Sequence, residues 1–128
     1  MILIDSDVAV DILRGYPPAI GWFDSLTGTE NLVVSGYTAI ELLAGTSNLT
    51  EQRKVQRWLD RFGVAWLSQS GCADALRLFG TFHLSHNAGL FDVFIGQTAL
   101  EYDIPLQTFN MKHYRFIPRI SLEQPYQR

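Results

Sequence analysis

Short apolar runs alternate along the chain with longer stretches in which apolar residues recur at helical spacing. The short runs are rich in β-branched residues, which is typical of buried parallel strands, although a run of four residues could also begin a helix. We predict strands at residues 1–4, 32–35, 64–67 and 104–109, with a last, short edge strand at 120–122.

The longer stretches predict six helices between these strands. Their expected ranges are Ser6 or Asp7 to Leu13, Pro17 to Leu26, Ser35 or Thr38 to Ala44, Thr50 to Phe62, Ser70 to Ser85, and Leu90 to Tyr102. Thr50 and Ser70 are the expected N-caps of the fourth and fifth helices, and Thr27–Thr29 is expected to end the second. Alternation of strand and helix favours one doubly wound α/β domain over residues 1–128, with a mainly parallel sheet of four to five short strands.

Composition bounds the class of protein. Of the 128 residues, 47% are hydrophobic and 18% charged, so a sizeable core can form. No apolar run approaches the roughly 18 residues of a membrane span, and the N-terminus lacks the basic start of a signal peptide. Cys72 is the single cysteine, which excludes an internal disulfide and a cysteine-based zinc site. These features predict a soluble protein of a reducing cytoplasm.

The net charge of −3 and the pI of about 5.5 differ from the basic footprint of a protein that grips nucleic acid through phosphate contacts alone. A polyanionic substrate would therefore need positive charge from another source. Bound divalent cations would supply it.

Three acids stand alone in apolar sequence. Asp5 follows the first strand, Glu41 lies in a helix that is apolar almost all round, and Asp92 lies near the start of the last helix. An unpaired buried carboxylate is costly. Each acid also has a structural explanation: a helix cap for Asp5, an ion pair with an arginine for Glu41, and a first-turn acid for Asp92. Together, however, they would repel one another unless a cation lay between them.

Carboxylate ligands of this kind suit Mg²⁺ or Mn²⁺, and such ions suit in-line attack of water on a phosphodiester. The sequence offers no phosphate-binding glycine loop and no Gly-x-Ser-x-Gly nucleophile motif. His83, His86 and His113 form no metal-binding pattern, and a surface or core role is expected for His83 and His86, which lie three residues apart on one helix.

Four segments, in this order, resemble the motifs of the PIN-domain ribonucleases, and more closely those of the VapC-type toxins of bacterial toxin–antitoxin pairs. They are Ile2–Val8, Thr38–Gly45, Phe91–Leu100 and Leu106–Tyr114. The resemblance implies a PIN-like three-layer α/β/α fold and a metal-dependent endoribonuclease. It also implies that Asp5, Glu41 and Asp92 hold Mg²⁺ or Mn²⁺ and that cleavage leaves 5′-phosphate and 3′-hydroxyl ends.

The fourth motif often contributes another Asp, and here that position is Asn110. Its amide can ligate a metal or its water but adds no charge. We therefore count Asn110 among the catalytic residues. Whether the site holds one metal ion or two stays open. Asp7 either supplies part of the missing charge or caps the helix. Ser6 and Thr108 are expected to orient ligands or the scissile phosphate, and Lys112, with its basic neighbours, to draw in RNA phosphates.

The family also implies two protein partners. One is a cognate antitoxin that plugs the acidic groove, and the other is a second copy of the chain, for which Trp22, Trp58 and Trp66 are candidate contacts. Two other classes stay open: a non-catalytic PIN-like module that binds RNA or protein, suggested by Asn110, and a phosphotransfer domain, suggested by the sequence Asp5-Ser6-Asp7.

Overall fold

The structure, a computed structural model, describes residues 1–26, 28 and 32–128. Its strands are β1 (Ile2–Ile4), β2 (Leu32–Ser35), β3 (Gly63–Ala65), β4 (Leu106–Gln107) and β5 (Leu122–Glu123). Its helices are α1 (Ser6–Leu13), α2 (Pro17–Ser25), α3 (Gly36–Ala44), α4 (Leu49–Leu59), α5 (Gln69–His86), α6 (Leu90–Tyr102) and the short 3₁₀ helix η2 (Met111–His113). Thr27 and Thr29, in the expected turn after the second helix, lie outside the described residues.

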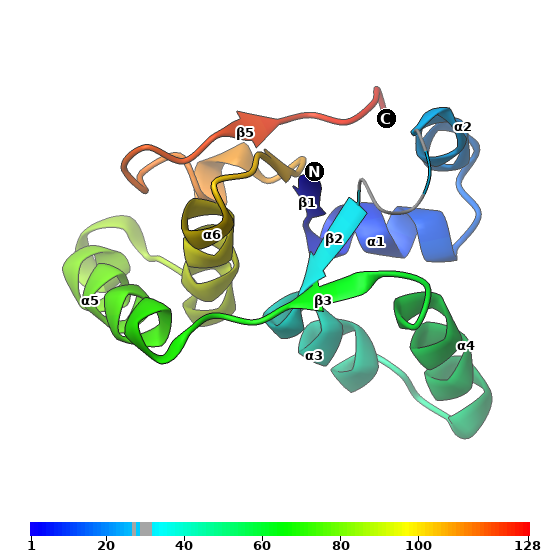
Figure 1. Cartoon of the computed structure of the whole chain (residues 1–128), viewed down its shortest axis with the longest axis horizontal. Coiled ribbons are helices and arrows are strands. Elements are labelled where there is room, and N and C mark those ends of the chain that lie inside the picture. Colours follow the sequence, from blue (N-terminus) through cyan, green and yellow to red (C-terminus); the bar gives the residue numbers. More distant parts are fainter. Residues whose placement is uncertain (27, 29–31) are drawn as a thin grey trace.

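The strands form one parallel sheet in the order β3-β2-β1-β4-β5 (Figure 1). Ile4, the last residue of β1, pairs with Val34 on one side and with Gln107 on the other. From β1 the chain builds the sheet outward through β2 and β3, and then returns to add β4 and β5 on the opposite side. The gap between β1 and β4 is thus a topological switch point, the place where α/β sheets bind ligands. The predicted α/β/α fold with a parallel sheet is confirmed.

Alternating side chains of the central strands feed two apolar cores. Ile4 and Val34 pack with residues of α1, α3 and α4 on one face of the sheet. Leu3 and Leu106 pack on the other face with α6 and the segment after η2. Figure 1 shows α5 and α6 on the opposite side of the strands from α1 and α2. Since both faces are covered, the central strands β1 and β2 are apolar up to Ser35, as the sequence predicted.

Several expected boundaries were wrong by a few residues. The N-cap of α4 is Asn48 and not Thr50, because the Asn48 side chain accepts from the Glu51 N–H at 2.9 Å. The N-cap of α5 is Ser68 and not Ser70. Helix α4 ends at Leu59, before the expected Phe62. Helix α6 has the expected bounds.

The strands also differ in extent from the expected ranges. Only Leu106–Gln107 of the predicted strand 104–109 has strand geometry, although Pro105 still accepts a backbone bond from Leu3 at 2.9 Å. Strand β3 lies one residue earlier than expected and ends two residues sooner, and β5 includes Glu123. Each of these strands is short, so its limits depend on one or two ladder bonds. None of the described helices is both long and apolar enough to cross a membrane.

Candidate active site

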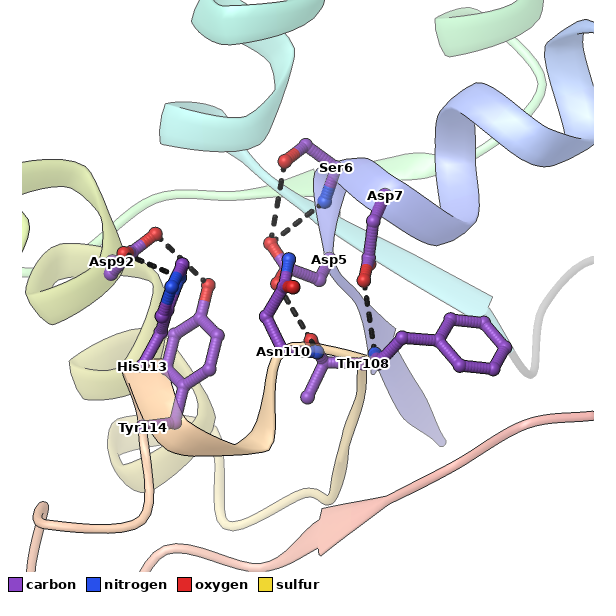
Figure 2. A network of polar contacts seen from close by, with 9 residues as sticks. Asp5, Ser6, Asp7, Asp92, Thr108, Asn110, His113 and Tyr114 are labelled. Carbon is purple, nitrogen blue, oxygen red and sulfur yellow. Dashed lines mark hydrogen bonds and ion pairs between the residues drawn. The ribbon is translucent and has the colours of Figure 1, made fainter. Parts of the chain in front are cut away.

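Asp5 lies at the switch point, directly after β1, and only 3% of its surface is exposed. One carboxylate oxygen, Oδ1, accepts from the Ser6 backbone N–H at 2.8 Å. The other, Oδ2, accepts from the Thr108 hydroxyl at 2.8 Å (Figure 2). Thr108 follows β4, so this bond joins the two strands that border the switch point. The parallel register fixes both residues at the same edge of the sheet.

The N-cap of α1 is Asp5, which confirms the structural explanation considered for Asp5 and corrects the expectation that Ser6 or Asp7 caps this helix. Asp7 instead lies in the first turn. Its Oδ1 accepts from the Val8 N–H at 2.8 Å, and its Oδ2 accepts from the Phe109 N–H at 2.9 Å. Both oxygens are thus engaged by backbone donors, which favours a structural role for Asp7: it ties α1 to the loop after β4.

Asp92 reaches the same edge from α6, which runs antiparallel to the strands and begins near the switch point. Its Oδ1 accepts from the Tyr114 hydroxyl at 3.4 Å, and its Oδ2 lies 3.4 Å from Nδ1 of His113 (Figure 2). Asp92 lies in the first turn of α6, which confirms the structural explanation considered for it. Gly89 is the N-cap of α6 and provides no side chain, so the carboxylate of Asp92 lies directly over it.

Glu41 lies on α3, and among the described residues it does not form the ion pair with an arginine that we considered. Its Oε1 is buried and has no hydrogen-bond partner among the described residues. Burial, followed by the charges of Asp5 and Asp92, raises the pKa of Glu41 to about 7. An orphaned buried carboxylate oxygen beside two further acids is the arrangement that a bound cation would satisfy.

Burial is also the largest cause of the raised pKa of Asp5, and the charge of Asp92 raises it further. The pKa of Asp92 is raised by burial too, although His113 and Tyr114 lower it in part. In the part of the chain that the structure describes, no three His, Cys, Asp or Glu side chains lie close enough together to hold a metal ion as they stand. The donor set is nevertheless all hard oxygen, which fits Mg²⁺ or Mn²⁺, ions that keep several waters and need few carboxylates.

The other predicted residues surround these acids. The backbone N–H of Asn110 donates to the Thr108 hydroxyl at 3.0 Å, so Asn110 lies in the loop that holds Asp5. Lys112 is exposed and lines a cavity that also contains Asp92. Ser6 lines a second groove, together with Glu41. The fold therefore places each of the predicted residues at one edge of the sheet.

Sequence reasoning missed one residue of this site. Tyr114 is fully buried, and its hydroxyl lies close enough to Asp5 and Asp92 to lower the pKa of both carboxyls. The two charges and the burial in turn raise the pKa of Tyr114 well above its usual value. The sequence holds little signal for it, because Tyr114 stands between His113 and Arg115, in a segment expected to be a polar loop or short turn.

Comparisons with known proteins agree with this geometry. The family profile described as "PIN domain" matches residues 2–116. "Ribonuclease VapC10" of Mycobacterium tuberculosis is 35% identical over 122 residues, which cover 94% of this chain and 91% of the relative. The chain therefore belongs to the PIN-domain family, and within it to the VapC group.

A second VapC relative and a solved structure support the same placement. "Ribonuclease VapC19" of Mycobacterium tuberculosis is 31% identical over 129 residues, which cover 98% of this chain and 100% of the relative. A structure described as "Toxin-antitoxin complex from Klebsiella pneumoniae" superposes with a TM-score of 0.79 at 21% identity, and the match covers 100% of each chain. At that identity the superposition speaks for the fold alone.

Proposed function

We propose that this chain is a metal-dependent endoribonuclease that cuts RNA phosphodiester bonds and acts as the toxin of a toxin–antitoxin pair. The observation that carries the proposal is the orphaned Oε1 of Glu41, a residue whose pKa is raised by burial and by the nearby charges of Asp5 and Asp92. The relatives named ribonuclease and the solved toxin–antitoxin complex support the activity and the partner.

Asp5, Glu41 and Asp92 would hold Mg²⁺ or Mn²⁺. When bound, such an ion lowers the pKa of a water ligand and stabilises charge on the leaving oxygen. The chain itself fixes the ligand geometry. Thr108 and the Ser6 N–H hold the two oxygens of Asp5, and Tyr114 holds Asp92. Asn110 offers an uncharged amide in the loop beside them.

RNA is the proposed substrate, and Lys112 is the proposed phosphate contact. Lys112 is exposed in η2, on the rim of the cavity that Asp92 lines. A basic rim beside an acidic centre would draw in a polyanion that the net charge of −3 otherwise repels.

A cognate antitoxin is the proposed inhibitor, and a groove of about 620 Å³ beside Glu41 is its proposed seat. Its lining includes Val10, Leu13, Leu42 and Val55 from α1, α3 and α4, next to the carboxylates of Glu41 and Glu51. An amphipathic segment with a basic side chain would bury its apolar face there and place positive charge on Glu41.

A homodimer is also proposed, through the face around Trp66. Of the three tryptophans considered, Trp58 is buried and Trp22 is half-buried against the core, whereas Trp66 is 52% exposed. Tyr37 lies between Trp66 and Phe91, with ring centroids 5.8 and 6.5 Å from its own. Exposed aromatic residues of this kind are enriched at interfaces.

Cys72, a free thiol, suits the reducing cytoplasm in which we place the protein.

Cleavage of a labelled single-stranded RNA pool tests the proposed activity. The wild type is compared with Asp5→Asn and Glu41→Gln in Mg²⁺, in Mn²⁺ and in EDTA, with Asp24→Asn on exposed α2 as the matched control. We expect metal-dependent cuts with 5′-phosphate ends in the wild type and the control only. Cutting that persists in EDTA or in both site variants would refute the proposal.

The second candidate is a PIN-like module that binds RNA or protein without cutting. Asn110 favours it, because the site has one charge fewer than a four-acid centre. A wild type that binds Mn²⁺ and RNA yet cuts no RNA in the pool would support this candidate. The family match to residues 2–116 speaks against a phosphotransfer domain.

A further inference from the structure

A cavity of about 590 Å³ opens beside Asp92, between the end of α5, the start of α6 and the chain around η2. Its volume lies within the roughly 300–1,000 Å³ of small-molecule sites. The proposed function assigns to this cavity only the phosphate contact of Lys112. The remaining lining residues give it a more definite chemistry.

Three basic side chains line the cavity. Lys112, His113 and Arg115 line it, and Asp92 is the one acid among its lining residues. Within the described ranges, neither Lys112 nor Arg115 forms an ion pair with a carboxylate. The N-terminus of α6 adds backbone N–H groups, since Gly89 leaves them without a side-chain cap. Free cationic side chains beside an uncapped helix start suit a phosphate group.

Two aromatic side chains also line the cavity. His86 and Phe116 line it with ring centroids 5.4 Å apart and planes 33° apart. Phe82 supports both rings from behind, at 5.2 Å from His86 and 5.0 Å from Phe116. Asn87 ends α5 in the left-handed conformation, so the chain turns sharply at the rim of the cavity. Rings that are fixed by a third ring and open to solvent on one side offer a platform on which a base can stack.

From this pairing we propose that the cavity is a nucleotide subsite, which rests on the proposed function. It takes one RNA nucleotide next to the scissile bond, with the base on His86 and Phe116 and the phosphate on Arg115 and Lys112. The nucleotide is adjacent to the scissile bond because Asp92 belongs both to the cavity and to the proposed metal centre (Figure 2). An acidic peptide would use the cations but would leave the aromatic platform without a function.

A substrate–variant cycle tests the proposal. An RNA oligonucleotide that the wild type cuts at one bond is prepared again with an abasic residue at each position flanking that bond. At one flanking position, removal of the base raises the KM of the wild type roughly tenfold, the scale of one base–aromatic stack. His86→Ala raises the KM for the intact RNA by the same factor and has no further effect on the abasic RNA.

Control variants isolate the platform. His83→Ala removes an exposed imidazole of the same helix that lies outside the cavity, so its KM remains at the wild-type value. Arg115→Ala raises KM for intact and abasic RNA alike, whereas Arg53→Ala, on exposed α4, changes neither. Equal effects of His86→Ala on intact and abasic RNA would overturn the base platform. An Arg115→Ala variant that loses antitoxin affinity while keeping its KM for RNA would assign the cavity to a peptide.

A binding measurement separates this proposal from the proposed activity. Adenosine and uridine 5′-monophosphates are titrated into the ¹⁵N-labelled chain, and amide shifts are followed by NMR. We expect saturable shifts at residues 86–89 and 112–116 that are lost in Arg115→Ala, whether or not the chain cuts RNA. Absence of shifts in a protein that does cut RNA would overturn the subsite and leave the nuclease intact.

Discussion

At the scale of single residues, Asp5 is both a helix cap and a proposed metal ligand, which the sequence presented as alternatives. It caps α1 with Oδ1 and joins β4 through Oδ2, and it is also the most buried of the proposed ligands. The three acids could be predicted because Glu41 and Asp92 are single charges within apolar stretches and Asp5 directly follows an apolar strand. The bond of Tyr114 to Asp92 could not be predicted, because only the packed fold brings the loop after β4 under α6.

Tyr114→Phe removes the hydroxyl and keeps the ring in its core site. We expect the variant to fold and its cleavage rate to fall roughly ten- to hundredfold at limiting Mg²⁺, the usual effect of losing a group that holds a metal ligand. Rates measured over a Mg²⁺ titration check this. Tyr102→Phe, whose hydroxyl donates to the Trp66 carbonyl away from the site, is the control. An unchanged Mg²⁺ requirement in Tyr114→Phe would remove the tyrosine from the site.

Thr108 gives a second test at this scale. Thr108→Val has nearly the same shape but lacks the donor that holds Oδ2 of Asp5 at 2.8 Å. We expect Thr108→Val to lose roughly tenfold or more in cleavage rate and Thr108→Ser to recover most of it. Equal activity of the two variants, measured with the same RNA, would mean that the hydroxyl does not orient Asp5.

At the scale of elements, the ends of helices and strands position the site, and these ends are where sequence prediction was least accurate. The helices α1 to α6 and the strands β1 to β5 of the described residues were expected near their observed positions, because their apolar spacing is clear. The caps at Asn48 and Ser68 were missed, because several Ser, Thr and Asn residues near each helix start compete for the same backbone N–H groups. Gly89 at the start of α6 illustrates what a cap position can determine.

Gly89→Ala should displace Asp92. A Cβ atom at residue 89 would lie 2.8 Å from Oδ2 of Asp92, and the flexible carboxylate would yield before the backbone. We expect a folded variant with cleavage reduced roughly tenfold, the effect of disturbing one ligand. Gly80→Ala is the matched control: nothing lies within 4 Å of its Cβ, and an alanine inside α5 should stabilise the fold by about 0.5–1 kcal/mol. Thermal melts and cleavage rates of both variants check the pair, and a fully active Gly89→Ala would contradict the assigned position of Asp92.

At the scale of the whole molecule, the fold concentrates negative charge at one edge of its sheet. Burial raises the pKa of Asp5, Asp7, Glu41 and Asp92 above their unfolded values. At pH values between the unfolded pKa values of about 4 and the higher folded pKa values, these carboxyl groups therefore take up protons when the chain folds. The stability present below pH 4 is lost as pH rises through the folded pKa values, which for Glu41 is about 7.

In EDTA the melting temperature should therefore fall as pH rises from 5 to 8. Glu41→Gln removes one of these charges, so we expect it to melt higher than the wild type at pH 8 in EDTA and to differ little at pH 5. Mg²⁺ should raise the melting temperature of the wild type and have little effect on the variant. Calorimetric scans at both pH values provide the measurement. A Glu41→Gln variant that is less stable than the wild type at pH 8 in EDTA would show that burial of the Glu41 carboxylate does not destabilise the fold.

The most direct test of the account is whether Asp5, Glu41 and Asp92 share one cation. Mn²⁺ titrations followed by electron paramagnetic resonance would compare the wild type with Asp5→Asn, Glu41→Gln and Asp92→Asn, and with Asp24→Asn as control. We predict that the wild type and the control bind Mn²⁺ alike and that each site variant binds it at least about tenfold more weakly. Wild-type affinity in any one of the three site variants would show that the acid in question is not a ligand, and in all three it would contradict the shared centre.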